Sequence, residues 1–200
     1  MKEKIFDAEK SAKLLKKVFL TKEVRQEFGT SEELVNKYIT PFLVNQIYTE
    51  RKAFLPKIRS FKEEIEQLFP EYRVIGRAKS LTSIFGKVMK NRSLADIFGI
   101  KIIVPTVEDC YSVKEWLFST YTVIHFDDKI KNPKDNGYSD LKVVIAYEVE
   151  PGTPIMVEFL MQSQQMYIDS QTIQNHAKAY PWKYQPVILE LPVEYKSVDL

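Results

Sequence analysis

Apolar positions in the first seventy residues recur with the spacing of amphipathic helices. The clearest run has an apolar residue at every third or fourth position: Phe54, Ile58, Phe61, Ile65 and Leu68. This spacing places the run on one helical face. Thr30 followed by Glu33 has the form of a capping box, which predicts a helix start there. Pro41 is expected to kink or split the helix that follows, and Pro70 to end the helical segment.

After Pro70 the pattern changes to alternating strands and helices. Short apolar runs predict strands at 72–76, 99–104, 121–126, 141–149 and 154–162. A turn at Pro151-Gly152 joins the last two strands as a hairpin. Helices are expected through Leu81, Ile84 and Val88, at 108–119 and at 164–178. The tail, interrupted by Pro181, Pro186 and Pro192, fits no regular element.

Together these elements predict a mixed α/β (α+β) fold, in which helices pack on a mixed sheet. We expect one compact domain, with a helical N-terminal segment at 1–70 packed on a core at 71–200. No internal repeat and no low-complexity segment interrupts this organisation.

Composition narrows the class of protein. The chain has 200 residues and a net charge of +2, from 29 basic and 27 acidic residues. Any affinity for nucleic acid must therefore come from a local patch. Cys110 is the single cysteine, which excludes an internal disulfide and a cysteine-based zinc site. No apolar run has the length of a signal peptide core or a membrane span, so we expect a cytoplasmic protein without membrane contact.

Basic residues cluster after the strand at 72–76. Lys79, Ser83 and Lys87 follow one another at intervals of four, so they project from one helical face, and Arg77 lies at the exit of the strand. Two cations, a hydroxyl and a guanidinium suit a triphosphate. A solvated basic helix face is the alternative interpretation. The glycine spacing of a Walker A loop is missing.

Two carboxylates interrupt apolar strands. Asp96 precedes the strand at 99–104, and Glu158 lies within the strand at 154–162. By alternation Glu158 shares a face with Met156 and Leu160, so neither face is clearly polar. Carboxylates on neighbouring strands form a natural Mg²⁺ site when a triphosphate supplies further oxygens. A strand-edge glutamate and a strand-start aspartate with purely structural roles are the alternative.

A polar loop separates the strands at 121–126 and 141–149. Asn136-Gly137 is turn chemistry, and Tyr138 follows it directly. With Lys134 before the turn, the loop is a candidate for an aromatic stacking platform beside a phosphate-binding lysine.

The order of these motifs resembles the synthetase domain of the RelA/SpoT family over roughly residues 72–184. Arg77, Lys79, Ser83 and Lys87 resemble its ATP-binding motif. Asp96 and Glu158 resemble its two Mg²⁺-binding carboxylates. The loop from Lys134 to Tyr138 resembles its acceptor loop, whose tyrosine stacks on the acceptor base. The resemblance also implies a nucleotidyltransferase-like mixed sheet flanked by helices.

The resemblance implies a reaction as well. Members of the family use ATP and Mg²⁺ to transfer the β,γ-pyrophosphate to a ribose 3′-hydroxyl, leaving AMP. Arg77, Lys79 and Lys87 would position the triphosphate, and Asp96 and Glu158 would hold the metal. Glu158 would also accept the proton of the acceptor hydroxyl.

The acceptor half departs from the family pattern. Lys142 stands where a histidine is usual, Lys101 where an arginine is common, and Leu160 and Gln162 replace a glutamine and an arginine. These changes favour an altered acceptor, namely the 3′-CCA end of tRNA, as in a toxic branch of the family that a partner antitoxin neutralises. The alternatives are a (p)ppGpp synthetase that uses GDP or GTP, an adenosine nucleotide acceptor, and a non-catalytic nucleotide-binding module.

A tRNA acceptor needs cations outside the nucleotide pocket. The candidates form two clusters and are Lys13, Lys16, Lys17, Lys90 and Arg92. A solubilising surface is the alternative interpretation of both clusters. The sequence leaves the oligomeric state and the identity of any antitoxin open.

Overall fold

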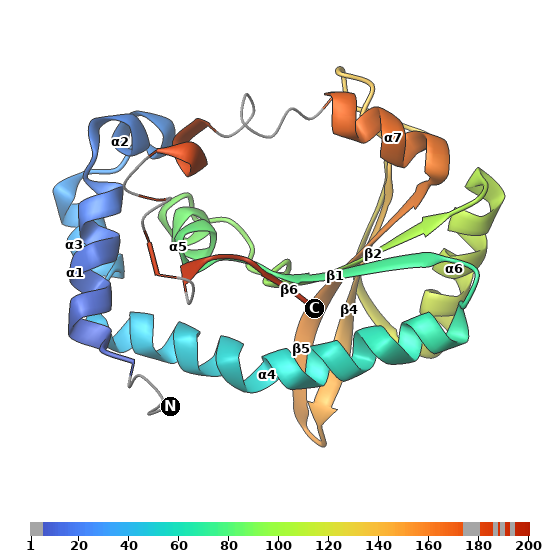
Figure 1. The fold of residues 1–200 in the computed structure, drawn as a ribbon, viewed down its shortest axis with the longest axis horizontal. Helices are drawn as coiled ribbons and strands as arrows, with labels where there is room; N and C mark the ends of the chain where they lie inside the picture. Colours follow the sequence, from blue (N-terminus) through green and yellow to red (C-terminus); the bar gives the residue numbers. More distant parts are fainter. Residues whose placement is uncertain (1–5, 174–180, 186–187, 189–190, 193–194) are drawn as a thin grey trace. The chain divides into compact units, whose positions relative to one another are not determined.

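The computed structural model describes residues 6–173, 181–185, 188, 191–192 and 195–200. Its helices are α1 (Ala8–Phe19), α2 (Lys22–Phe28), α3 (Glu32–Tyr38), α4 (Pro41–Leu68), α5 (Leu81–Met89), α6 (Val107–Thr120), α7 (Gln164–Ile173) and the short 3-10 helix η1 (Pro181–Tyr184). Its strands are β1 (Arg73–Ala78), β2 (Phe98–Val104), β3 (Thr122–Asp128), β4 (Leu141–Glu150), β5 (Thr153–Ser163) and β6 (Val198–Asp199). The predicted mixed α/β class is confirmed (Figure 1).

The chain divides into two compact units. The helical unit comprises 1–53, 80–94 and 180–196, and the sheet unit comprises 54–79, 95–179 and 197–200. The chain therefore leaves the sheet unit after Lys79 and returns to it at Ala95.

The start of α3 corrects the predicted capping box. Ser31, not Thr30, caps this helix, because the Ser31 hydroxyl accepts a hydrogen bond from the Leu34 amide at 3.1 Å. Thr30 is buried, and its hydroxyl donates instead to the carbonyl of Phe19 at 3.2 Å. Pro41 opens α4, where a missing amide hydrogen costs nothing, so the predicted helix is split rather than kinked.

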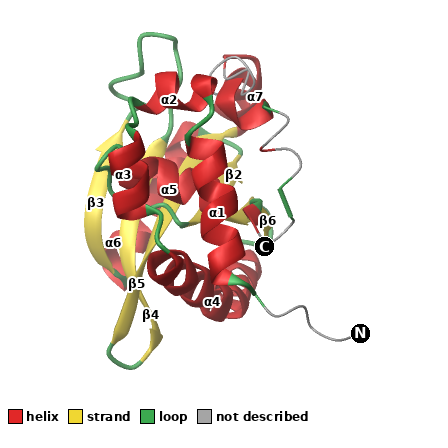
Figure 2. Cartoon of the chain, turned by 90° about the vertical axis from the view of Figure 1, so that its left-hand side faces the viewer, coloured by secondary structure: helices red, strands yellow, loops and turns green. Residues whose placement is uncertain are grey.

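The sheet has the strand order β3-β4-β5-β2-β1-β6. Strand β5 runs parallel to β2 and antiparallel to β4, and β1 is antiparallel to both of its neighbours. The predicted hairpin is confirmed: β4 and β5 pair along most of their length and extend beyond the other strands (Figure 2). Gly152 in its turn has φ of 76°, a left-handed conformation that favours glycine. Strand β6 has only two residues, too few for any sequence pattern to reveal it.

One face of the sheet forms the core of its unit. Val157, Phe159 and Met161 of β5 are fully buried in a cluster with Phe61 of α4 and Val113 of α6. The alternate positions of β5 lie on the opposite face, where Met156 is 41% exposed. The sheet therefore does have an apolar and a polar face, although the sequence of β5 alone left this open. Across the part of the chain that the structure describes, no helix has the length and apolarity to cross a membrane.

Candidate active site

A row of paired residues crosses the polar face of the sheet. Arg77 of β1 pairs with Gly99 of β2, and Gly99 pairs in turn with Glu158 of β5. Paired residues point to the same face, so Arg77 and Glu158 flank a position that has no side chain. A Cβ atom on Gly99 would lie 3.7 Å from Nε of Arg77. The guanidinium group thus leans over the glycine toward Glu158.

Lys79 and Asp96 meet where β1 ends and β2 begins. The two strands are antiparallel, and the Lys79 amide donates to the carbonyl of Ile97 at 2.7 Å, which continues the ladder by one residue. The Lys79 ammonium forms an ion pair with the Asp96 carboxylate. Both side chains are 13% exposed, so each keeps a part that solvent can contact.

Glu158 and Asp96 influence one another electrostatically. Burial is the main reason that the pKa of Glu158 is raised, and the negative charge of Asp96 raises it further. The nearby cations Lys142, Arg77 and Lys79 act in the opposite direction. Two carboxylates that repel each other in a half-buried site are stabilised by any cation that joins them.

Asp96 and Glu158 suit a Mg²⁺ site in which the substrate supplies the remaining ligands. No group of three or more His, Cys, Asp or Glu side chains within the described residues is arranged to hold a metal. Mg²⁺ is usually held by one or two carboxylates, waters and substrate phosphates rather than by a complete protein cage. Asp96 and Glu158 match that requirement and remain the predicted ligands.

A second row lies further along the same face. The Lys101 ammonium of β2 donates to Oε1 of Gln162 at 3.1 Å, and Nε2 of Gln162 donates to the Ser139 carbonyl at 2.9 Å. Gln162 is fully buried. Burial and the positive charge of Arg77 lower the pKa of Lys101. Lys101 and Gln162, two departures from the family pattern, therefore contact each other and tie the loop before β4 to the sheet.

Tyr138 lies in the structure as a buried side chain, with 7% of its surface exposed. Its hydroxyl donates to Asp140 at 2.6 Å, and burial together with the Asp140 charge raises its pKa. Lys134 Nζ lies 5.0 Å from the centroid of the ring, and the Tyr138 amide donates to Oδ1 of Asn136 at 3.1 Å. The acceptor loop is thus closed on itself, because the buried carboxylate draws the ring inward. Base stacking on Tyr138 stays a prediction.

Sequence reasoning missed the charge network under this loop. Asp140 is 2% exposed, and Lys129 Nζ lies 3.4 Å from it and 2.5 Å from Asp127. Lys142, predicted to contact the acceptor, lies 3.8 Å from Asp127. The pairing of these charges depends on how the loop folds, which the order of residues along the chain does not reveal.

Two predicted ATP-binding residues belong to the helical unit. Ser80 caps α5 and its hydroxyl donates to that of Ser83 at 2.9 Å, while Lys87 Nζ donates to the Ser93 carbonyl at 3.1 Å. Arg77 and Lys79 lie in the sheet unit. The structure therefore brings Arg77, Lys79, Asp96 and Glu158 together within one unit, and describes Ser83 and Lys87 separately.

The predicted tRNA-binding cations also lie in the helical unit. Lys13 and Lys17 of α1 are exposed, Lys16 is half-buried, and Arg92 is exposed. Lys90 forms an ion pair with Glu27 at 3.3 Å and lies 4.4 Å from the ring centroid of Phe28. One member of the predicted set is therefore already engaged within its own unit.

The sequence is similar to known proteins. A family model described as "Region found in RelA / SpoT proteins" matches residues 76–185. A GTP pyrophosphokinase of Haemophilus influenzae is 32% identical over 130 residues, which cover 62% of this chain and 16% of that protein. The GTP pyrophosphokinase rsh of Brucella ovis is 28% identical over 185 residues, covering 78% and 25%. The chain thus spans a quarter or less of these two relatives.

The fold of this chain is similar to that of a solved structure. The small alarmone synthetase 1 from Bacillus subtilis superposes with a TM-score of 0.54 at 25% identity. The superposition covers 66% of this chain and 80% of that chain.

Proposed function

Because this chain belongs to the RelA/SpoT family, we propose that it is a pyrophosphokinase that transfers the β,γ-pyrophosphate of ATP to the 3′-hydroxyl of a guanosine nucleotide. Membership of the family confirms the resemblance found in the order of the motifs. The reaction, its substrates and the roles of the residues are our proposal.

One observation carries the proposal. Two carboxylates and two cations meet on the polar face of the sheet, where Asp96 pairs with Lys79 and Glu158 lies in register with Arg77. Structural carboxylates pair with cations and need no second carboxylate nearby. Here the negative charge of Asp96 raises the pKa of Glu158, so the two carboxylates repel each other. A site that binds Mg²⁺ and transfers a highly charged phosphate group needs two such carboxylates close together, which would explain this repulsion.

The arrangement supports an in-line displacement. Arg77 and Lys79 bind the ATP phosphates and spread the charge that develops on them. The 3′-oxygen of the acceptor attacks the β-phosphorus, the bond between that phosphorus and the α,β-bridging oxygen breaks, and AMP leaves with the bridging oxygen. Glu158 accepts the proton of the 3′-hydroxyl, a role for which its raised pKa suits it. Bound Mg²⁺ would be held by Asp96 and Glu158 and would neutralise phosphate charge.

We place the guanosine nucleotide first as acceptor, ahead of the tRNA 3′ end that the altered acceptor half favoured. The two curated relatives are named for GTP. One cation predicted to contact tRNA is engaged within its own unit, namely Lys90, which forms an ion pair with Glu27. A tRNA acceptor and a neutralising antitoxin become outcomes that the acceptor assay decides.

The test is an acceptor assay with γ-labelled ATP and Mg²⁺. GDP, GTP, an adenosine nucleotide and deacylated tRNA are offered separately, and products are resolved by thin-layer chromatography and denaturing gel. We expect label in guanosine tetra- or pentaphosphate. Label confined to the tRNA 3′ end or to an adenosine product would replace the acceptor, and no transfer to any acceptor would refute the proposed function.

Matched variants separate chemistry from folding. Asp96→Asn and Glu158→Gln should each reduce transfer at least a hundredfold, since each removes a charge at the reacting phosphates. Asp169→Asn on α7 and Glu148→Gln on β4 make the same chemical changes at exposed positions and should leave the rate unchanged. Full activity of both site variants would remove Asp96 and Glu158 from the mechanism.

A further inference from the structure

Three cations on the polar face of the sheet lie outside the ion pairs found among the described residues. Arg73, Arg77 and Lys101 form no ion pair within the described part of the chain, and Lys101 donates only to the neutral amide of Gln162. Arg73 and Arg77 lie four residues apart on the same face of β1, a separation of about 13 Å. Glu158 is close enough to Arg77, and Asp140 to Lys101, to act on them electrostatically, but neither carboxylate forms a salt bridge with these cations. Three cations outside any ion pair form a surface that attracts anions, and its length exceeds what one triphosphate beside Arg77 needs.

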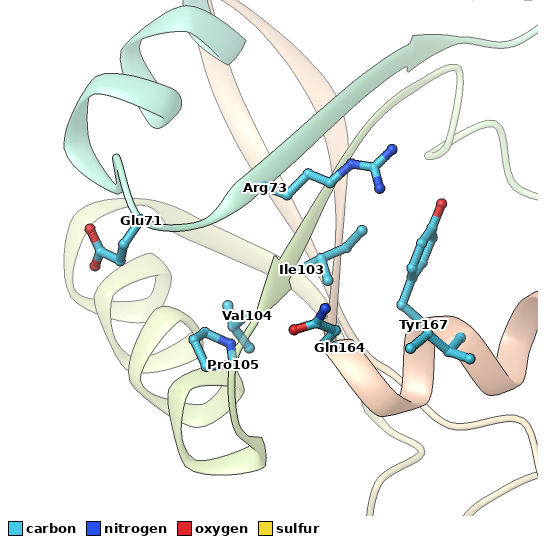
Figure 3. A pocket seen from close by; sticks show the side chains of 8 residues that line it. Glu71, Arg73, Ile103, Val104, Pro105, Gln164 and Tyr167 are labelled. Carbon is cyan, nitrogen blue, oxygen red and sulfur yellow. The ribbon is translucent and has the colours of Figure 1, made fainter.

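Arg73 lines a pocket next to this surface. The pocket has a volume of about 300 Å³, and its apolar lining residues are Ile103, Val104, Pro105 and Ile168. Figure 3 shows Arg73 extending from β1 toward the ring of Tyr167 on α7. The guanidinium carbon lies 5.6 Å from the ring centroid, and Lys101 Nζ lies 5.3 Å from the same centroid. Two cations from neighbouring strands therefore converge on one aromatic side chain.

Resting on the proposed function, we propose that Arg73 and Lys101, beside Tyr167, bind the 5′-phosphates of the acceptor nucleotide. A guanidinium, an ammonium and a phenol are all hydrogen-bond donors, whereas a phosphate chain offers only acceptors. Tyr167 makes cation–π contacts with both cations, and Lys101 keeps further N–H donors besides the one that it gives to Gln162.

The position suits the acceptor rather than the donor. The ATP phosphates lie by Arg77, close to Glu158, because the 3′-hydroxyl and the β-phosphorus must meet there. The ribose separates the 3′-hydroxyl of the acceptor from its 5′-phosphates. These phosphates therefore fall some distance from Glu158, and Arg73 provides an unpaired cation about 13 Å along the strand.

The pocket contains one carboxylate, Glu71, which would repel a phosphate. Figure 3 shows Glu71 at the end of the pocket away from Tyr167. We therefore place the phosphates at the Tyr167 end of the pocket, between Arg73 and Lys101. Acceptor affinity should consequently increase with the number of 5′-phosphates, and a tRNA terminus, whose 5′ side is a phosphodiester, should gain little from this subsite.

Steady-state kinetics with saturating ATP test the subsite. Arg73→Gln should raise the KM for GTP about tenfold or more, because it removes charge-assisted hydrogen bonds. The KM for GMP should change less than threefold, and kcat with GTP should be retained. Arg73→Lys should recover part of the loss. Arg59→Gln makes the same charge change at an exposed position of α4 and should alter none of these constants. A KM for GTP that stays unchanged, or that rises equally with GTP and GMP, would overturn the inference.

A binding measurement keeps this test separate from the proposed function. GTP is titrated calorimetrically into protein whose donor site is saturated with a non-hydrolysable ATP analogue. Weaker GTP binding by Arg73→Gln than by Arg59→Gln supports the phosphate subsite even where no transfer occurs, in which case only the proposed reaction fails. Equal binding by both variants, or no GTP binding by the unmodified protein, overturns the subsite.

Discussion

Gln162 is the residue whose replacement most directly tests the geometry of the acceptor half. Gln162→Leu removes the acceptor for Lys101 and the donor to the Ser139 carbonyl. A hydrogen bond to a charged group contributes about 1.5–3 kcal/mol, and an unsatisfied buried carbonyl costs about 1–3 kcal/mol. Lys101 recovers part of its loss from water because it is only half-buried, and leucine is the more apolar side chain. We expect a net loss of about 2 kcal/mol.

Urea unfolding followed by circular dichroism measures this loss. With an m-value of about 2 kcal/mol/M, the midpoint should fall by about 1 M. Gln165→Leu, an exposed position on α7, is the matched control and should shift the midpoint by less than a quarter as much. Gln162→Glu keeps an acceptor for Lys101 but cannot donate to Ser139, so its loss should be intermediate. If Gln162→Leu were no less stable than the control, the network from β2 to the loop would not exist in solution.

Three further predictions concern the sheet unit. Burial and Asp96 raise the pKa of Glu158 above its ordinary value of 4.5, so ionised Glu158 destabilises the folded state above the raised pKa. Glu158→Gln should therefore raise the melting temperature at pH 7 while abolishing transfer, and this advantage should disappear as the pH falls to 4.5; equal melting temperatures at pH 7 would contradict it. Burial raises the pKa of the Cys110 thiol to about 12, so a disulfide reagent at pH 8 should modify it only after unfolding, and rapid labelling of the native protein would speak against a buried thiol. A Cβ atom on Gly76 would lie 2.9 Å from Cβ of Leu200, so Gly76→Ala should lower the free energy of unfolding, measured by thermal unfolding, by about 1–3 kcal/mol. A Cβ atom on Gly152 would meet no neighbour within 4 Å, so Gly152→Ala should show only the cost of its left-handed backbone.

The apolar pattern predicted five strands of the sheet because each of them contains an apolar run. The hairpin of β4 and β5 and the helix after it were predicted from such runs, and the part of that prediction beyond Ile173 lies outside the described residues. The start of α3 was misplaced by one residue, since both Thr30 and Ser31 can cap a helix and only the contact of Thr30 with Phe19 decides between them. Strand β6 was missed because a two-residue strand has no period.

The candidate site was predictable in its residue types and not in its pairings. Arg77 and Glu158 are far apart in the sequence, and only the register through Gly99 shows that they share a row. Tyr138 was expected as a stacking surface, yet its hydroxyl donates to the buried Asp140, a contact that depends on how the loop closes. Arg73 drew no attention as a single arginine at the start of a strand. Its importance comes from Tyr167, which another element brings to it.

The point where the chain leaves the sheet unit has a consequence for how such proteins diversify. The segment 80–94 leaves the sheet unit after Lys79 and rejoins it at Ala95. Its two ends are held together by the Lys79–Asp96 ion pair and by the hydrogen bond from the Lys79 amide to the Ile97 carbonyl. Because its ends are joined, a change of length in this segment need not shift the register of β1 and β2. The entropic cost of closing a loop also grows only slowly with its length. Insertions and deletions between these two anchors can therefore accumulate during evolution while the reacting strands keep their alignment.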